Sequence, residues 1–245
     1  LEGVKNAIQV GRELRERGHE MVGVRLDSGD LTQLSIDSRK LLDEEGFSDA
    51  KIVASGDLDE YEIEEIKKNG GKVDIWGVGT KLVTSFEEPA LGGVYKISAI
   101  TNEQGEWRYR LKLSEELLKV SNPGIQQVRR FYENGKAMGD AIFDESHAPE
   151  GECEIINQLD EKTMKTFDQG TEFKDLLEPV FRKGKFVGER PPLENIQQRV
   201  KDQMDLFEPG VKKFTKPDHY PAGLERWLFD KKKELVEHVK EVMGG

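Results

Sequence analysis

Three short stretches in the first part of the chain combine side chains that suit a phosphorylated sugar. Residues 25–30 read RLDSGD, residues 55–57 read SGD and residues 77–81 read GVGTK. Glycines let backbone amides approach phosphate closely, and a helix start adds favourable partial positive charge. Carboxylates hold ribose hydroxyls directly or through Mg²⁺, and arginine pairs with phosphate. The three stretches therefore predict a phosphate-binding site.

Each of these features also has a purely structural interpretation. Asp30 and Asp57 stand where helices are expected to begin, and N-capping alone would explain either. A lone G-x-G-T string is weak evidence, because glycines also serve turns. Arg25 and Asp27 could form a structural ion pair; residues i and i+2 of a strand share a face, so the two point the same way. The residue types by themselves leave both interpretations open.

Strand and helix signals alternate through the first ninety residues and explain how the three stretches come together. Capping boxes begin at Asp30 and Asp57, and apolar runs predict strands at 21–26, 51–54 and 73–76. Such alternation predicts parallel βα units with right-handed crossovers. Active sites of parallel βα folds collect at the carboxyl ends of the strands, where the three stretches lie.

The pattern changes after Pro89. Paired strands are expected around a turn at 102–105 and around Asn134-Gly135, residues 145–172 are polar without a clear pattern, and helices are expected at 193–207 and 223–242. The predicted fold class is α/β. Residues 1–93 are expected to form part of an irregular TIM-like α/β barrel, and residues 94–245 an outer, β-rich α+β domain with carboxyl-terminal helices.

Composition limits the function classes. The formal net charge of −11 argues against general nucleic-acid binding. The single cysteine, Cys153, excludes an intrachain disulfide, indicates a reducing cytoplasmic compartment and is interpreted as a structural or surface thiol. No stretch approaches the roughly 18 apolar residues of a membrane span. Because the chain begins at Leu1 rather than methionine, we expect it to be part of a longer protein.

The strings themselves resemble a known family. Residues 23–31 (GVRLDSGDL), 55–60 (SGDLDE) and 76–82 (WGVGTKL) are similar to successive strand-end motifs of nicotinate phosphoribosyltransferases, which are type II phosphoribosyltransferases. Further similar segments follow in the same order, nearly to the end of the chain: residues 89–96 (PALGGVYK), 112–114 (KLS), 119–124 (KVSNPG) and 220–221 (YP).

The resemblance implies an activity. Enzymes of this family transfer the ribosyl phosphate of phosphoribosyl pyrophosphate to nicotinate, forming nicotinate mononucleotide and pyrophosphate in NAD salvage. The expected cofactor is Mg²⁺, with ATP as a co-substrate that is hydrolysed. The resemblance also implies a homodimer with shared active sites. The composition described above predicts a cytoplasmic enzyme with no nucleic-acid or membrane partner.

The resemblance also implies roles for individual residues. Arg25, Asp27 and Asp57 are the expected catalytic residues: Arg25 near the pyridine ring and phosphates, Asp27 on the ribose or the metal-bound pyrophosphate, and Asp57 on the ribose. Asp27 is further expected to contact Mg²⁺ indirectly. The residues expected to bind substrate or phosphate are Ser28, Gly29, Ser55, Gly56, Gly77, Val78, Gly79, Thr80, Lys96 and Lys112.

One departure from the family pattern matters. The family's amino-terminal half carries an aromatic ring-binding residue, further arginines and a histidine that ATP phosphorylates, and the four histidines here (His19, His147, His219 and His238) match none of its motifs. We therefore expect the chain to be inactive alone. Three alternatives remain: a sibling enzyme that uses nicotinamide or quinolinate, a non-catalytic phosphate-binding module of the same fold, or an unrelated phosphate-binding barrel enzyme.

Overall fold

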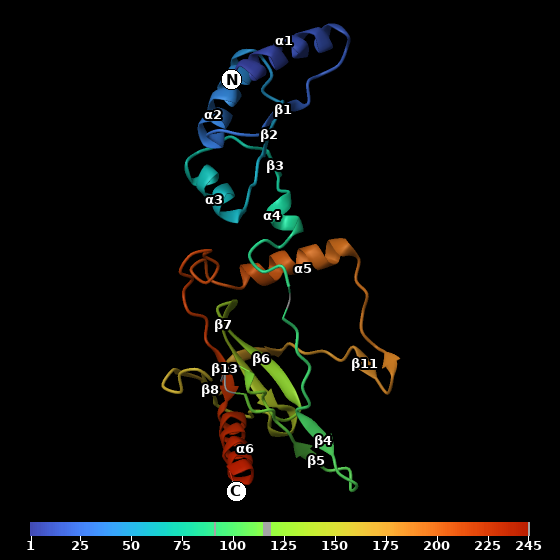
Figure 1. Cartoon of the computed structure of the whole chain (residues 1–245), viewed down its shortest axis with the longest axis vertical. Coiled ribbons are helices and arrows are strands. Elements are labelled where there is room, and N and C mark those ends of the chain that lie inside the picture. Colours follow the sequence, from blue (N-terminus) through green and yellow to red (C-terminus); the bar gives the residue numbers. More distant parts are fainter. Residues whose placement is uncertain (91, 115–118, 245) are drawn as a thin grey trace. The chain divides into compact units, whose positions relative to one another are not determined.

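The computed structural model describes residues 1–90, 92–114 and 119–244. The chain divides into two compact units, Leu1–Gly93 and Val94–Gly245 (Figure 1). Leu91, within the stretch 89–96 that resembles the family, lies outside the described residues. No helix in the described ranges is both long and apolar enough to cross a membrane.

The first unit is built from parallel βα units. Its three strands pair in the order β1-β2-β3, and both pairings are parallel. Its elements are α1 (Glu2–Glu16), β1 (Gly23–Leu26), α2 (Leu31–Glu44), β2 (Lys51–Ser55), α3 (Glu60–Lys68), β3 (Ile75–Gly77) and α4 (Thr80–Val83). The predicted partial α/β barrel is confirmed, with β3 shorter than its apolar run suggested.

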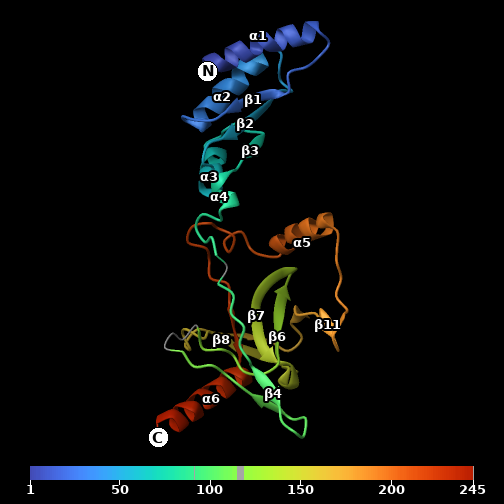
Figure 2. The same ribbon diagram turned by 45° about the vertical axis from the view of Figure 1, so that its right-hand side comes forward.

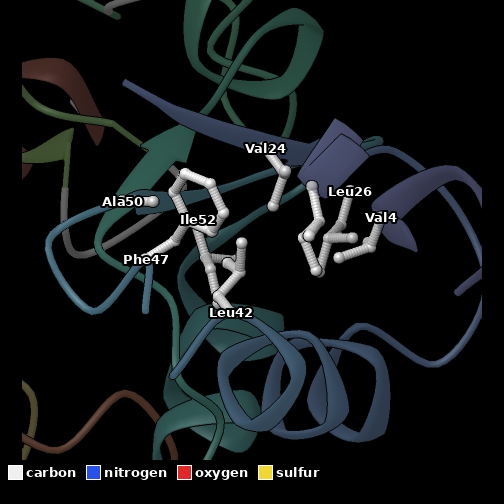
Figure 3. Packing of buried hydrophobic residues seen from close by; sticks show 8 residues of the cluster. Val4, Val24, Leu26, Leu42, Phe47, Ala50 and Ile52 are labelled. Atoms are coloured by element: carbon white, nitrogen blue, oxygen red, sulfur yellow. The ribbon is translucent and has the colours of Figure 1, made fainter. Parts of the chain in front are cut away.

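The core of this unit lies between the sheet and its first two helices. Figure 3 shows Val4 of α1 and Leu42 of α2 packed against Val24, Leu26 and Ile52 of the strands. Successive strand residues point to opposite faces. Arg25, between the buried Val24 and Leu26, therefore points away from the core and is exposed.

The starts of α2 and α3 differ in how well the sequence predicted them. Asp30 caps α2, because its Oδ1 accepts a hydrogen bond from the backbone N–H of Gln33 at 3.0 Å. The expected cap at Asp57 is wrong: Asp59 caps α3 instead. Asp57 has a φ of +48°, so it lies in a left-handed turn that precedes the helix. That turn brings Leu58 into the core, which delays the helix by two residues.

The second unit is centred on a six-stranded sheet with the order β10-β6-β7-β13-β8-β9. Its long central hairpin is formed by β6 and β7 (Figure 2). Its elements are β4 (Ala99–Thr101), β5 (Trp107–Tyr109), β6 (Gln126–Glu133), β7 (Lys136–Asp144), η2 (Glu145–His147), β8 (Cys153–Ile156), β9 (Met164–Phe167), β10 (Glu172–Asp175), β11 (Phe181–Arg182), β12 (Lys185–Phe186), α5 (Leu193–Asp205), β13 (Ala222–Glu225) and α6 (Arg226–Gly244). The predicted β-rich α+β class is confirmed.

Strand β13 corrects the expectation of a helix from residue 223. Its residues pair in parallel with β7 and antiparallel with β8, and α6 begins only at Arg226. Gly223 permits this close approach, since a Cβ there would lie 2.3 Å from the carbonyl oxygen of Ile156. Leu224 is fully buried between the neighbouring strands.

Aromatic and aliphatic side chains form the core of the second unit. The rings of Phe131 and Phe167 stack with centroids 4.0 Å apart, and Cys153 and Ile155 pack beside them. Burial raises the pKa of the Cys153 thiol to about 12. Cys153 is therefore a structural thiol, which agrees with its interpretation from the sequence.

Candidate active site

The carboxyl ends of β1 and β2 are joined by a closed network of three side chains. Ser55 Oγ accepts a hydrogen bond from Arg25 Nε at 2.9 Å and donates one to Asp27 Oδ1 at 2.5 Å. Arg25 Nη2 donates to the same Oδ1 at 2.8 Å. We call these three residues the strand-end triangle. The sequence predicted that Arg25 and Asp27 share a face, and their contact is consistent with that.

Both charged members of the strand-end triangle remain open to solvent. The side chains of Arg25 and Asp27 are 65% and 63% exposed. The hydrogen bond from Ser55, and then the Arg25 guanidinium, lower the pKa of Asp27 below its ordinary value. At neutral pH the Asp27 carboxylate is therefore ionised, and the hydrogen bonds from Ser55 and Arg25 fix its orientation.

Gly56 is needed for the strand ends to close together. Its φ is +110°, and a Cβ at this position would lie 2.5 Å from the backbone oxygen of Asp27. Any other residue would push the two loops apart. Gly56 therefore acts by permitting close contact, whether or not it also touches a substrate.

Five of the predicted site residues line one cleft of about 430 Å³. They are Asp27, Ser28, Gly29, Gly56 and Asp57. The rest of the lining is Leu31, Thr32, Glu62, Glu65 and Ile66. We call this the acidic cleft, because its charged lining residues are all carboxylates. Such a lining suits sugar hydroxyls or a hydrated cation better than a bare phosphate.

The third predicted stretch lies beside the strand-end triangle. Gly77 pairs with Ser55 in the β2–β3 register, and a Cβ on Gly77 would lie 3.3 Å from the Ser55 side chain. Gly79 is the N-cap of α4, and a Cβ added to it would meet nothing within 4 Å. We call residues 77–80, which the sequence analysis predicts to bind phosphate, the phosphate loop. Because α4 has only four residues, the partial charge expected from a helix start is that of a single turn.

Two predicted residues, Lys96 and Lys112, belong to the second unit and share a different cleft. This cleft, of about 570 Å³, is lined by Val94, Tyr95, Lys96, Ile97, Ile100, Arg110, Leu111 and Lys112. We call it the cationic cleft, after its three basic side chains. The ammonium of Lys96 donates to the backbone oxygen of Lys119, so one of its donors is already engaged.

Comparisons with known proteins show the family of the chain. Residues 125–232 match the family model described as the nicotinate phosphoribosyltransferase C-terminal domain. The chain is 39% identical to nicotinate phosphoribosyltransferase of Bacillus subtilis (strain 168), covering 97% of this chain and 49% of that protein. It is 31% identical to the enzyme of the same name from Dictyostelium discoideum, covering 93% and 41%. The chain belongs to the nicotinate phosphoribosyltransferase family.

A solved structure shares the fold of this nicotinate phosphoribosyltransferase family member. The crystal structure of human nicotinic acid phosphoribosyltransferase aligns with a TM-score of 0.62 at 20% identity, over 89% of this chain and 41% of that one. The chain spans about half the length of the curated relatives it matches, 49% and 41% for the two named above.

Mg²⁺ is the metal that the family resemblance implies for this site. In the described ranges, no three or more His, Cys, Asp or Glu side chains are grouped so that they could hold a metal ion. The described residues therefore do not supply a complete set of protein ligands for a metal ion. Mg²⁺, however, commonly takes one or two carboxylates and completes its shell with water and substrate phosphates. Asp27 fits that limited, indirect role.

One ion pair beside the site, between Lys81 and Asp59, was not predicted from the sequence. The Lys81 ammonium donates to Oδ2 of Asp59, beside the phosphate loop. Val78 and this pair help to line a second cleft of the first unit, of about 380 Å³. The spacing alone gave no signal for the contact, since the two residues lie 22 positions apart.

Proposed function

We propose that this chain supplies the ribosyl-phosphate-binding part of a nicotinate phosphoribosyltransferase. The reaction is formation of nicotinate mononucleotide and pyrophosphate from nicotinate and phosphoribosyl pyrophosphate, as part of NAD salvage. The observation that carries the proposal is the strand-end triangle, which stands beside the phosphate loop in a chain of this family.

Each group has a role set by the charge that develops during transfer. The bond from the sugar carbon to pyrophosphate breaks while the ring nitrogen of nicotinate forms a new bond to that carbon. Positive charge grows on the sugar, and the carboxylates of Asp27 and Asp57 on the acidic cleft stabilise it. Arg25 faces the phosphates and the pyridine ring, and backbone amides of the phosphate loop hold the 5′-phosphate.

Magnesium and ATP belong to the same proposal. Asp27 would hold Mg²⁺ together with substrate phosphates, and the ion supplies charge neutralisation for the leaving pyrophosphate. ATP is the hydrolysed co-substrate, and its coupling requires groups that the family carries in its amino-terminal half. The chain alone is therefore expected to be inactive.

The clefts of opposite charge support a homodimer with shared sites. A pyrophosphate group needs cations, and the acidic cleft offers carboxylates instead. The cationic cleft carries Lys96, Arg110 and Lys112 and would meet that need from a second copy. The single cysteine supports a cytoplasmic location.

The test is product formation by this chain with the amino-terminal half of the enzyme supplied. Nicotinate, nicotinamide and quinolinate are offered separately with phosphoribosyl pyrophosphate, Mg²⁺ and ATP. We expect nicotinate mononucleotide from nicotinate alone, formed about 100-fold more slowly in Asp27→Ala but at the normal rate in Asp49→Ala, a matched change at another exposed carboxylate. Turnover of another pyridine would assign a sibling enzyme. Phosphoribosyl pyrophosphate binding without product would instead assign a non-catalytic module.

A further inference from the structure

We propose that Asp59 and Lys81 form a positioning pair that holds the phosphate loop in the conformation that binds the 5′-phosphate. This inference rests on the proposed function and adds two residues to it. Neither side chain needs to touch the substrate. Both act through the backbone of residues 77–80.

The pair connects two elements through the two oxygens of one carboxylate. Oδ1 of Asp59 accepts from the backbone N–H of Glu62 at 2.9 Å and so caps α3. Oδ2 accepts from the ammonium of Lys81, in the first turn of α4. The start of α4 is thereby tied to the start of α3.

The pair is more sheltered than the strand-end triangle. The side chains of Asp59 and Lys81 are 18% and 31% exposed, about half or less of the exposure of Arg25 and Asp27. The hydrogen bond from Lys81 lowers the pKa of Asp59, and the same bond raises the pKa of Lys81. Both groups are therefore charged at neutral pH. Engaged in this way, they are suited to positioning rather than to contact with a ligand.

Among the described residues, the other side-chain contacts of helix α4 are local: Thr84 Oγ1 donates to the carbonyl oxygen of Thr80 at 2.7 Å, and the Lys81 ammonium lies 5.8 Å from the centroid of the Phe86 ring. None of its residues is buried, its N-cap Gly79 makes no side-chain cap bond, and Leu82 and Val83 are largely exposed. A single unpacked turn is marginal in water, because few contacts offset the ordering of its backbone. Val78 packs against the buried cluster of Ala54, Leu58 and Ile66 and so holds the first half of the phosphate loop, whereas the Asp59–Lys81 pair contributes much of what fixes its second half at the start of α4.

The position of the pair also links the two strand ends that form the site. Asp59 follows Asp57 by two residues, and Lys81 directly follows the phosphate loop. Gly77 and Ser55 are partners in the sheet, so the two loops leave the sheet side by side. The pair then joins the same loops again after they leave it. This second connection fixes the geometry between the ribose end and the phosphate end of the site.

The first experiment uses variants that remove charge but keep the cap. Asp59→Asn retains an oxygen for the Glu62 N–H, since Asn is as good an N-cap as Asp. Lys81→Met removes the ammonium and keeps the aliphatic chain, and Lys81→Arg is the conservative rescue. Glu64→Gln is the matched control, because it breaks the exposed Glu64–Lys68 pair on α3, whose atoms lie 2.9 Å apart.

The first readout is steady-state kinetics with the amino-terminal half supplied. We expect Asp59→Asn and Lys81→Met each to raise KM for phosphoribosyl pyrophosphate roughly three- to tenfold while kcat changes less than about twofold. A loop that holds the phosphate equally in ground and transition states affects KM alone. The double variant should be no worse than either single one. Lys81→Arg should lie near wild type, and so should Glu64→Gln.

The second readout does not depend on turnover. Backbone amides of Val83 and Thr84 donate to Gly79 and Thr80, so their hydrogen exchange reports on α4 in this chain alone. We expect faster exchange at residues 79–86 in Asp59→Asn but not in Glu64→Gln. If wild type forms no product but exchange responds as expected, the proposed function fails while the positioning of the loop stands. Unchanged exchange with unchanged KM, or loss of kcat with general unfolding, would overturn the inference.

Discussion

Two Arg–Asp pairs in this chain have the same chemistry but opposite surroundings. In the first unit, Arg25 and Asp27 are 65% and 63% exposed. In the second unit, the side chains of Arg130 and Asp140 are 14% and 17% exposed. Arg130 Nε and Nη2 donate to the two carboxylate oxygens of Asp140 at 2.8 and 2.7 Å. The first pair keeps solvent-facing surface, whereas the second is enclosed.

The difference separates the pair proposed to bind substrate from a structural pair. Arg130 and Asp140 are partners in the β6–β7 register, and the hydroxyl of Tyr220 adds a third contact to the same carboxylate at 2.9 Å. That pair joins two strands and the segment that leads to β13. The exposed pair joins two loops at the end of a sheet, where a ligand can still reach it. Burial, rather than residue type, distinguishes the two roles.

The largest expected effect is a loss of stability when the enclosed Arg130–Asp140 pair is broken. Asp140→Ala leaves the Arg130 guanidinium uncompensated in a sheltered place, and we expect a loss of about 3–5 kcal/mol in unfolding free energy. Urea unfolding followed by circular dichroism measures it. Tyr220→Phe removes only one hydrogen bond and should cost about 1 kcal/mol. If Asp140→Ala lowered the unfolding free energy by less than about 1 kcal/mol, the cost of one hydrogen bond, the enclosed Arg130–Asp140 pair would not be structural.

The next effect concerns activity. Asp27→Ala should lower kcat/KM about 100-fold, in the range seen when one group that stabilises transition-state charge is removed. Its unfolding free energy should change by less than about 0.5 kcal/mol, because exposed pairs contribute little. Kinetics with the amino-terminal half supplied and urea unfolding of the same variant measure the two values. A large stability loss with normal activity would reverse the roles assigned to the two pairs.

A substitution at Gly56 tests whether the strand ends that carry the exposed Arg25–Asp27 pair approach each other closely. Gly56→Ala introduces a Cβ against the Asp27 carbonyl at a φ of +110°, and we expect a loss of about 1–3 kcal/mol in unfolding free energy. Gly3→Ala is the matched control in the same unit, since a Cβ there meets nothing within 4 Å. On an exposed helix position it should stabilise by up to about 1 kcal/mol. Equal effects of both changes would contradict the close approach of the strand ends.

The smallest expected effect is a shift in the pKa of Asp27. The pKa of Asp27 is lowered in the folded chain, so its contribution to stability is present above the pKa of the unfolded chain and is lost as pH falls through the folded pKa. We expect an NMR titration to give a pKa below the ordinary value. Ser55→Ala, which removes the leading cause, should move this pKa upward. No movement would mean that the strand-end triangle does not persist in solution.

Much of the first unit could be predicted from the sequence because its signals are local. Asp30 with its cap partner and the apolar run at 51–54 mark α2 and β2 without reference to the rest of the chain. In the second unit, the Asn134-Gly135 turn was equally clear, and both residues have the positive φ of such a hairpin, 50° and 75°. Local chemistry decided these elements.

Other elements depended on distant partners and were missed. The four residues of β13 carry no strand pattern of their own, and they form a strand because Gly223 fits between β7 and β8. Strands β8 and β9 lie in the polar stretch 145–172, where pairing with each other decides their conformation. The cap of α3 moved from Asp57 to Asp59 because Leu58 is buried.

For the candidate site, the sequence by itself determined which residue types stand at the strand ends, because strand alternation orients Arg25 and Asp27 together. Only the tertiary structure decided that Ser55 bridges them, that Lys81 reaches Asp59, and that Lys96 and Lys112 share a separate cationic cleft. The physical reason is range. Capping, turns and strand alternation act over a few residues, whereas burial and hydrogen bonding between loops exist only after distant segments have packed.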